Sequence, residues 1–343
     1  MNSSLAQTRQ PFIQFAAKTK NRELLRASSS GGAFSELAQV VLAQGGAVFG
    51  AGWDEHFHVV HKCIETEMCL GELRGSKYVQ SKLNDAPQKI KELLAQGRMI
   101  LFSGTPCQVA AIRKQFGESP LLLLCSIMCH SNVPSGVWEK YLREVQDEEK
   151  DTITAISFRD KRISWRKYSL TIEFARAGHV VSQRFGATLY GKIFFSGFAT
   201  LPACFHCPFR QGKHGADLMI GDYWGIEKSY PNLNDDDGVS AILVFTEQGR
   251  KFLQESALSL HEVAYSTIPP GNMALGKCIS SDEVKRQRFQ RAWQKTSLKR
   301  AYIYATEGPW YRRFANHTLE SVERVREHLS RVKQACMRRL CKP

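Results

Sequence analysis

Hydrophobic positions in the first half of the chain follow two alternating spacings, which predict strands interleaved with helices. Apolar side chains recur every three or four residues in the predicted helices, at residues 35–44, 107–116 and 134–145. Short continuous apolar runs predict the strands between them, at residues 47–53, 99–104 and 121–128. The last run fits a parallel strand that is covered on both faces. The alternation indicates an α/β unit, whose ligand crevice lies beyond the carboxyl ends of its parallel strands.

The second half of the chain has shorter runs in which apolar and polar residues alternate. These runs predict strands of an antiparallel or mixed sheet, at residues 152–158, 168–174 and 179–185. A buried strand at 238–246 and a helix at 246–256 are predicted after them. The predicted fold class is α/β: a mixed or parallel sheet with helices in the N-terminal part, then an α+β part with antiparallel strands and a C-terminal helical tail.

These patterns divide the chain into four parts. Residues 1–27 are polar and mixed, and we expect an entry arm with little structure of its own. An α/β domain over 28–150 and a second domain over 151–300 follow. Residues 301–343 predict a basic amphipathic tail, in which nine Lys and Arg stand against three Glu from Trp310 onward. The tail could dock on a partner, contact a membrane surface peripherally, or pack on the protein.

Composition and charge narrow the class of protein. Hydrophobic residues make up 43% and charged residues 23%, as in ordinary globular proteins. No apolar stretch approaches the ~20 residues of a membrane-spanning helix, and no secretory signal is visible, so we expect a cytoplasmic protein. The net charge of 47 − 33 = +14 favours anionic partners. Nucleic acid, phosphorylated cofactors, acidic proteins and membrane surfaces all satisfy that preference.

The ten cysteines are the main candidates for chemistry, because cytoplasmic thiols are kept reduced and can bind metal. Cys204 and Cys207 form a C-x-x-C pair, which supplies two of the four ligands of a zinc or iron–sulfur site. Cys107 and Cys129 each follow a predicted parallel strand, so both fall at the sheet edge that holds the crevice. Cys125 is a possible substitute ligand. The spacing also allows a redox-active dithiol or four unrelated buried thiols.

Three further segments could bind a ligand. Residues 28–32, a Ser/Gly run that opens a predicted helix, either present backbone N–H groups to an anion or form an ordinary N-cap. Lys77 could contact a phosphate or a flavin carbonyl and Tyr78 could pack on a ring, or both could lie in a solvated loop. Cations and aromatics interleave in 158–168, as in sites for single-stranded nucleic acid. A charged, exposed sheet edge has the same pattern, and we favour that interpretation.

Several motifs of common enzyme classes are absent from the sequence. There is no G-x-G-x-x-G after a strand, no G-x-x-x-x-G-K-[ST], no H-E-x-x-H and no G-x-S-x-G. A standard dinucleotide fold, a P-loop NTPase, a zincin and a lipase-type hydrolase are therefore disfavoured.

Eight segments, taken together and in order, are far more specific than any one of them. They are SSSGGAFSELA, GAVFGAGWD, LRGSKYVQS, ILFSGTPCQVAAI, CHSNVPSGVWEKYL, ISFRDKRISW, CFHCPFR and DLMIGDYWGIE. In this order they resemble the coenzyme F420 hydrogenase/dehydrogenase beta-subunit family of flavin and iron–sulfur oxidoreductase subunits. The resemblance covers roughly residues 14–295.

The resemblance implies FAD, bound in a fold other than that of classical dehydrogenases, with a [4Fe-4S] cluster close to it. The cluster ligands implied by position in the motifs are Cys107, Cys129, Cys204 and Cys207. The implied flavin contacts are Ser29, Ser30, Gly31 and Gly32, with Lys77, Tyr78 and Thr105 as further candidates.

The chain departs from the family pattern in ways that bear on the substrate. Ser126 stands where an Asp is common, and 129–133 holds one extra residue, while His214 matches a usual basic position. These changes leave the implied cluster ligands in place. They weaken the expectation that the chain binds an F420-type substrate. Many relatives also carry an N-terminal ferredoxin-like domain, and this chain begins where that domain would end. We therefore expect electrons to come from a separate protein.

The function expected from this resemblance is that of a cytoplasmic oxidoreductase or its electron-transfer subunit. It would pass electrons through FAD and the [4Fe-4S] cluster, between a ferredoxin-like carrier or partner subunit and a small-molecule two-electron substrate. No nucleic acid is expected on this interpretation. Two alternatives come from other classes: a zinc-containing RNA-binding protein without redox activity, and a partner-docking scaffold built around the basic tail.

Overall fold

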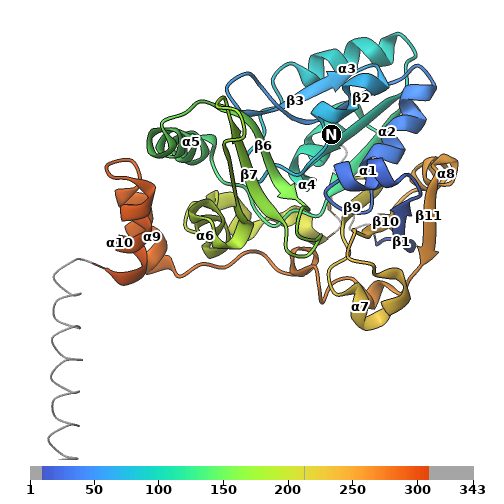
Figure 1. Ribbon diagram of the computed structural model, residues 1–343. Helices are drawn as coiled ribbons and strands as arrows, with labels where there is room; N and C mark the ends of the chain where they lie inside the picture. The colour runs from blue at the N-terminus through green and yellow to red at the C-terminus, as the bar shows by residue number, and fades with distance from the viewer. Residues whose placement is uncertain (1–9, 212, 309–343) are drawn as a thin grey trace, which may run out of the picture. The chain divides into compact units, whose positions relative to one another are not determined.

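The structure, a computed structural model, describes residues 10–211 and 213–308 (Figure 1). The chain divides after Ser280 into two compact units. The first unit holds both β-sheets and the helices packed on them. In the second unit, the residues that the structure describes form two helices, α9 (Glu283–Ala292) and α10 (Leu298–Glu307).

The larger sheet has eight strands, in the order β11-β1-β10-β9-β5-β4-β2-β3. The strands are β1 (Ile13–Thr19), β2 (Ala47–Trp53), β3 (Val59–Ile64), β4 (Ile100–Gly104), β5 (Leu122–Ile127), β9 (Leu218–Asp222), β10 (Ser240–Val244) and β11 (Leu258–Glu262). The four middle strands β9, β5, β4 and β2 run parallel, and the strands outside them pair antiparallel. The sheet is therefore mixed, as the sequence predicts.

Helices cover the parallel strands on both faces, which explains their continuous apolar sequences. The helices of this unit are α1 (Arg22–Ala27), α2 (Ala33–Ala43), α3 (Ala86–Ala95), α4 (Pro106–Phe116), α5 (Ser135–Glu149), α6 (Leu189–Ser196), α7 (Ile226–Ser229) and α8 (Glu247–Glu255). Short 3₁₀ turns complete it: η2 (Glu67–Glu72), η3 (Phe185–Ala187), η4 (Pro202–His206), η5 (Pro208–Gln211), η6 (Pro231–Leu233), η7 (Tyr265–Thr267) and η8 (Met273–Leu275).

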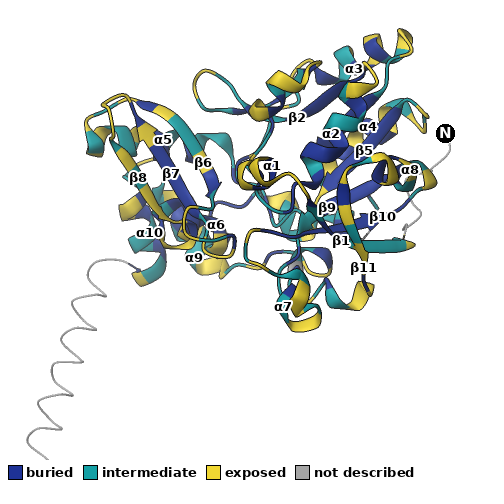
Figure 2. Ribbon diagram, turned by 45° about the vertical axis from the view of Figure 1, so that its right-hand side comes forward, coloured by how far each residue is buried: buried dark blue, intermediate teal, exposed yellow. Residues whose placement is uncertain are grey.

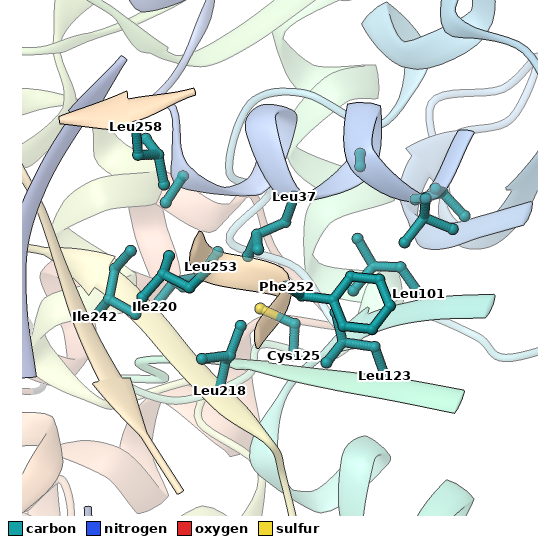
Figure 3. Packing of buried hydrophobic residues seen from close by; sticks show 14 of the residues in the cluster. Leu37, Leu101, Leu123, Cys125, Leu218, Ile220, Ile242, Phe252, Leu253 and Leu258 are labelled. Atoms are coloured by element: carbon teal, nitrogen blue, oxygen red, sulfur yellow. The ribbon is translucent and has the colours of Figure 1, made fainter. Parts of the chain in front are cut away.

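Alternate side chains of each strand enter separate cores. On β5, Leu123 packs in the core under α2 and α8, which includes Leu37 and Phe252 (Figure 3). The neighbouring Leu122 and Leu124 pack in the core under α3 and α4. Burial of both faces fixes the register, because a shift of one residue would exchange the two sets.

The smaller sheet is antiparallel, with the order β6-β7-β8. Its strands are β6 (Ile153–Asp160), β7 (Ser169–Phe174) and β8 (Val180–Arg184). Aromatic rings join it to the helices beside it: the Trp138 ring centroid on α5 lies 4.8 Å from that of Phe158 and 4.9 Å from that of Tyr190 on α6. Figure 2 shows β7 largely buried and β8 largely exposed.

The entry arm expected over residues 1–27 is wrong for the part that the structure describes. β1 lies inside the large sheet, where it pairs with β10 and β11, and α1 follows it. Ala16 and Ala17 give β1 only a weak apolar signal, and its partner strands come more than 200 residues later. The chain leaves the large sheet after β5, at Ile127, and the boundary expected near residue 150 falls between α5 and β6, which pack together. The chain returns to that sheet at β9, so residues on both sides of 150 share one unit.

The expected tail begins within α10, and its residues 309–343 lie outside the described residues. Within the described ranges, no helix is both long and apolar enough to cross a bilayer.

Candidate cofactor-binding site

A cavity of about 470 Å³ lies at the carboxyl ends of the parallel strands. Its lining includes Gly104 at the end of β4, Thr105 directly after it, Cys129 after β5, and Asp222 at the end of β9. This is the place where open α/β sheets bind their ligands. The cavity also receives the Ser/Gly loop and the segment around Tyr78.

Ser29 and Ser30 line the cavity and are held by bonds to other segments. The Oγ of Ser29 accepts hydrogen bonds from the N–H of Ser76 at 2.8 Å and from its hydroxyl at 3.2 Å. The hydroxyl of Ser30 donates to the Val239 carbonyl at 2.8 Å. The loop is therefore fixed between the segment before Tyr78 and the start of β10.

The two glycines of the loop have different roles. Gly31 is buried against β1 and β10 and is not among the lining residues: an added Cβ would lie 2.2 Å from the Ala17 carbonyl oxygen. Gly32 lines the cavity and is the N-cap of α2, with a φ of +89° that favours glycine. The first N–H groups of α2 therefore start at the cavity wall, where the helix dipole favours an anion.

Lys77 lines the cavity, but its ammonium is directed at the backbone. The Nζ donates to the carbonyls of Ala51 at 2.7 Å and Arg74 at 2.9 Å. Burial, with a smaller effect from the ammonium of Lys62, lowers the pKa of Lys77 to about 7. These two hydrogen bonds join the backbone of β2 to the segment around Arg74, so Lys77 stabilises the cavity wall.

Thr105 lines the cavity at the N-terminus of α4, and Cys107 is the second residue of that helix. The Thr105 Oγ1 lies 3.1 Å from the Sγ of Cys107 and donates to the Oε1 of Gln108 at 2.9 Å. The sulfur of Cys107 therefore lies in the first turn of α4, beside the cavity wall.

His61 forms part of the cavity lining from β3. Its Nδ1 lies 2.7 Å from the Ser81 hydroxyl and its Nε2 3.1 Å from the Ser103 carbonyl. Burial lowers the pKa of His61 to about 4, and Lys77 adds to the shift. The ring is therefore neutral at pH 7. Its Nε2–H donates to the carbonyl, and its Nδ1 accepts from the hydroxyl.

A buried arginine, Arg159 of β6, joins several parts of the cavity wall. Its two Nη atoms bind the Asp222 carboxylate at 2.6 Å and 2.7 Å, and they also donate to the Tyr78 hydroxyl at 3.2 Å and the Ser29 carbonyl at 2.8 Å. Its guanidinium carbon lies 4.2 Å from the ring centroid of Tyr168. The sequence pattern favours a sheet edge for this segment and does not single out Arg159. β6 is an edge strand of its sheet, but Phe158, Arg159 and Trp165 are buried, so the expectation of an exposed edge is wrong for these residues.

The two cysteines that follow parallel strands come close to the C-x-x-C pair. Burial, followed by the thiols of Cys107 and Cys204, raises the pKa of Cys129 to about 12, and Cys207 adds to the same shift. Charge on one of these sulfur atoms therefore acts on the others, which requires proximity. Burial likewise raises the pKa of Cys204, with smaller contributions from Cys207 and Cys107.

Main-chain bonds hold the two cysteine segments side by side. The N–H of Leu201 donates to the Asn132 carbonyl at 3.0 Å. The N–H of Asn132 donates in turn to the sulfur of Cys204, which lowers the pKa of that thiol. The buried Arg210 donates to the His130 carbonyl and brings a positive charge near Cys129.

A four-thiol set has the chemistry of an iron–sulfur site. No three or more His, Cys, Asp or Glu side chains in residues 10–211 and 213–308 are placed to hold a metal ion. A [4Fe-4S] cluster is larger than one ion and takes one Cys thiolate on each of its four irons. The four cysteines fit such a group in number and ligand type.

Two other cysteines clarify the ligand set. Cys125 is fully buried in the core with Leu123, Leu218 and Leu253 (Figure 3), so the interpretation of it as a substitute ligand is wrong. Its position two residues after Leu123 places it on the core face of β5. Cys278 was not expected near the site, yet its thiol donates to the Cys207 carbonyl at 3.8 Å. No motif connects these two, because the contact forms between distant loops.

A second cavity of about 520 Å³ adjoins the first and shares its residues Tyr168, Phe195 and Trp224. Arg166 and Arg184 also line it, so its wall combines aromatic rings with two cations. Phe195 is 49% exposed between the two cavities.

A family model that describes the C terminus of the coenzyme F420 hydrogenase/dehydrogenase beta subunit matches residues 97–266. These residues therefore belong to the C-terminal domain of this beta-subunit family. The match includes all four candidate cluster cysteines and Arg159, and the family places the chain among oxidoreductases. The resemblance that the ordered motifs indicate is confirmed.

The fold is similar to that of a chain in the xenon-derivatised F420-reducing [NiFe] hydrogenase complex from Methanosarcina barkeri. The TM-score is 0.53 and the identity 15%, over 86% of this chain and 97% of that chain. No curated protein matches the chain. None of these findings supports the RNA-binding alternative.

Proposed function

We propose that this chain binds FAD in the cavity and a [4Fe-4S] cluster at Cys107, Cys129, Cys204 and Cys207, and passes electrons between a redox carrier protein and a two-electron substrate. A flavin can exchange electrons singly with a cluster and in pairs with a substrate, which is the chemistry that this pair of cofactors supplies. The observation that supports the proposal is that Cys129 lines the cavity and that the thiols of Cys107, Cys204 and Cys207 act on its pKa.

The lining of the cavity supports a phosphorylated ligand. The helix α2 begins at its wall without a side-chain cap, so it offers unpaired N–H groups and a positive dipole end. The helix α4 also begins there, but Pro106 and a Thr105–Gln108 capping box occupy its first turn, so it contributes mainly its dipole. The Asp222 carboxylate is already paired with Arg159, so it does not present an isolated negative charge. Apolar and aromatic groups such as Ile127 and Phe195 complete a surface on which a flat ring can pack.

The position of Cys129 supports electron transfer between the two groups. Cys129 lines the cavity and also belongs to the cysteine set. Cys107 touches Thr105, another lining residue. Cys129 and Cys107 would therefore hold a cluster next to the cavity that would hold the flavin.

The second cavity is our candidate for the entry of the small-molecule substrate. It adjoins the proposed flavin site through Tyr168, Phe195 and Trp224. Arg166 and Arg184 favour a substrate that carries negative charge. The carrier protein, whether a ferredoxin-like protein or a partner subunit, is proposed from the family and from the excess of positive charge, which favours an acidic surface.

Anaerobic purification of the full chain tests the proposal directly. We expect a brown protein with about four irons and four sulfides per chain, together with FAD released on denaturation. Single Ser substitutions at Cys107, Cys129, Cys204 and Cys207 should each lower the iron content, whereas Cys69→Ser, matched in chemistry but outside the set, should not. A colourless protein, or one that holds a single zinc and retains RNA in a salt-dependent way, would contradict the proposal.

A further inference from the structure

Arg159 reaches the cavity wall from the small sheet, while its partners come from three other segments. Asp222 ends β9 of the large sheet, Ser29 lies in the loop before α2, and Tyr78 lies between η2 and α3. All three partners line the cavity. One guanidinium therefore holds together parts of the wall that are far apart in sequence.

The contacts use most of the hydrogen-bonding capacity of the guanidinium. Arg159 donates twice to Asp222 and once each to the Ser29 carbonyl and the Tyr78 hydroxyl, and its side chain is 2% exposed. The Asp222 carboxylate also accepts from the Trp165 Nε1 at 2.6 Å. A buried charge without its partner is costly, so the pair stabilises this one arrangement strongly.

The aromatic contacts extend the same arrangement to both cavities. The guanidinium lies over the rings of Tyr168 at 4.2 Å and Trp224 at 5.3 Å, measured to their centroids. Both rings line the first and second cavities. Movement of Arg159 would therefore shift the wall that the two cavities share.

We propose that Arg159 is a positioning residue for the flavin: it sets the Ser/Gly loop, Tyr78 and the shared aromatic wall in the arrangement that accepts the ring. This inference rests on the proposed function and deepens it. A lysine cannot replace the arginine here, because a single ammonium lacks the planar fork that binds a carboxylate and two further acceptors together.

The chain supplies a matched control in a second buried arginine–aspartate pair. Arg113 on α4 donates from Nη2 to both Asp217 oxygens at 3.1 Å and 3.0 Å, and its Nε donates to the Gly215 carbonyl at 2.8 Å. Neither member of that pair is among the lining residues of the two cavities. Arg113→Lys therefore tests the general cost of damaging a buried pair.

The experiment compares Arg159→Lys with Arg113→Lys in the full, anaerobically purified chain. After removal of the flavin, FAD is titrated back, and thermal unfolding and the visible circular dichroism of the bound flavin are recorded. We expect both variants to unfold at lower temperature. Only Arg159→Lys should weaken FAD binding, by about tenfold or more, and change the flavin dichroism at saturation. Tyr78→Phe, which removes one contact and no charge, should change both readouts less.

Amide hydrogen exchange provides a readout that does not depend on flavin. In the flavin-free protein, Arg159→Lys should speed exchange in residues 28–32 and 76–78, and Arg113→Lys should not. Unchanged FAD affinity and dichroism in Arg159→Lys, or an equal loss in Arg113→Lys, would overturn the positioning role. A wild-type chain that binds no FAD would instead overturn the proposed function. The exchange comparison would still decide whether Arg159 holds the two segments.

Discussion

The hydroxyl of Thr105 lies 3.1 Å from the Sγ of Cys107, so a residue expected at the flavin touches a residue expected at the cluster. Both belong to the start of α4. A thiolate ligand at Cys107 can only accept, so the Thr105 hydroxyl would donate to it in place of the Gln108 Oε1. A hydrogen bond to a ligand sulfur favours the reduced cluster.

Thr105→Val is therefore expected to lower the midpoint potential of the cluster, by a shift on the order of tens of millivolts. Thr105→Ser keeps the hydroxyl and should leave the potential close to wild type. A redox titration followed by electron paramagnetic resonance measures both variants. Equal potentials in the valine and serine variants would show that the hydroxyl does not act on the cluster.

Cys125 should affect stability and leave iron binding intact. Cys125→Ser places a hydroxyl in an apolar core that offers it little compensation, at a cost of about 1–3 kcal/mol in the free energy of unfolding. Iron content per folded chain should equal that of wild type. Chemical denaturation and iron analysis on the same sample separate the two effects, and a loss of iron comparable to that in Cys129→Ser would restore Cys125 as a ligand.

Because His61 is buried, we expect the protein to lose stability in acid. Its pKa falls from 6.5 to about 4 in the fold, so between these values the unfolded chain binds a proton that the folded chain does not. The free energy of unfolding should therefore decrease as the pH falls from 6.5 toward 4, by at most about 3 kcal/mol from this group. Above pH 6.5 its contribution is fully present.

His61→Gln isolates that contribution, because glutamine can still donate and accept a hydrogen bond but does not titrate. Urea unfolding between pH 7.5 and pH 5 should show a smaller decrease in stability for this variant than for wild type. The exposed His56→Gln serves as the control. If the free energy of unfolding decreased equally with pH in wild type and His61→Gln, the titration of His61 would not contribute to the loss of stability.

Gly31 should tolerate no side chain. A Cβ there would lie 2.2 Å from the Ala17 carbonyl oxygen and 2.6 Å from the Ser240 nitrogen, both backbone atoms. Gly31→Ala is expected to separate the loop from β1 and β10, with a loss of several kcal/mol in unfolding free energy. Gly71→Ala, where nothing lies within 4 Å of the added atom, should be nearly neutral. Thermal unfolding of the two variants tests the contrast.

The sequence predicts the fold best where local patterns decide it. The continuous apolar run of β5 and the periodic helices α2 and α4 follow from spacing alone, and so does the crevice at the strand ends. β1 escapes prediction because its alanines give little pattern. Its place in the sheet depends on β10 and β11, whose contacts no local window contains.

The candidate site is predictable to the extent that motifs mark it. The cysteines and the Ser/Gly loop stand in recognisable segments, and six of the seven expected flavin residues line the cavity. Arg159 does not stand out in the sequence, because its role depends on partners from β9 and the loop before α2. A sequence in which charged and aromatic residues alternate looks the same on an exposed sheet edge and in a buried cavity wall. The two differ in the burial of the side chains, which the sequence pattern does not give.

The interior position of β1 also constrains how the protein is made. Its neighbours β10 and β11 begin at Ser240 and Leu258, so the first strand leaves the ribosome long before either can pair with it. Until then an edge of the nascent sheet stays open, and pairings of such long separation form slowly. Chaperone demand during synthesis should therefore persist until the chain has passed β11.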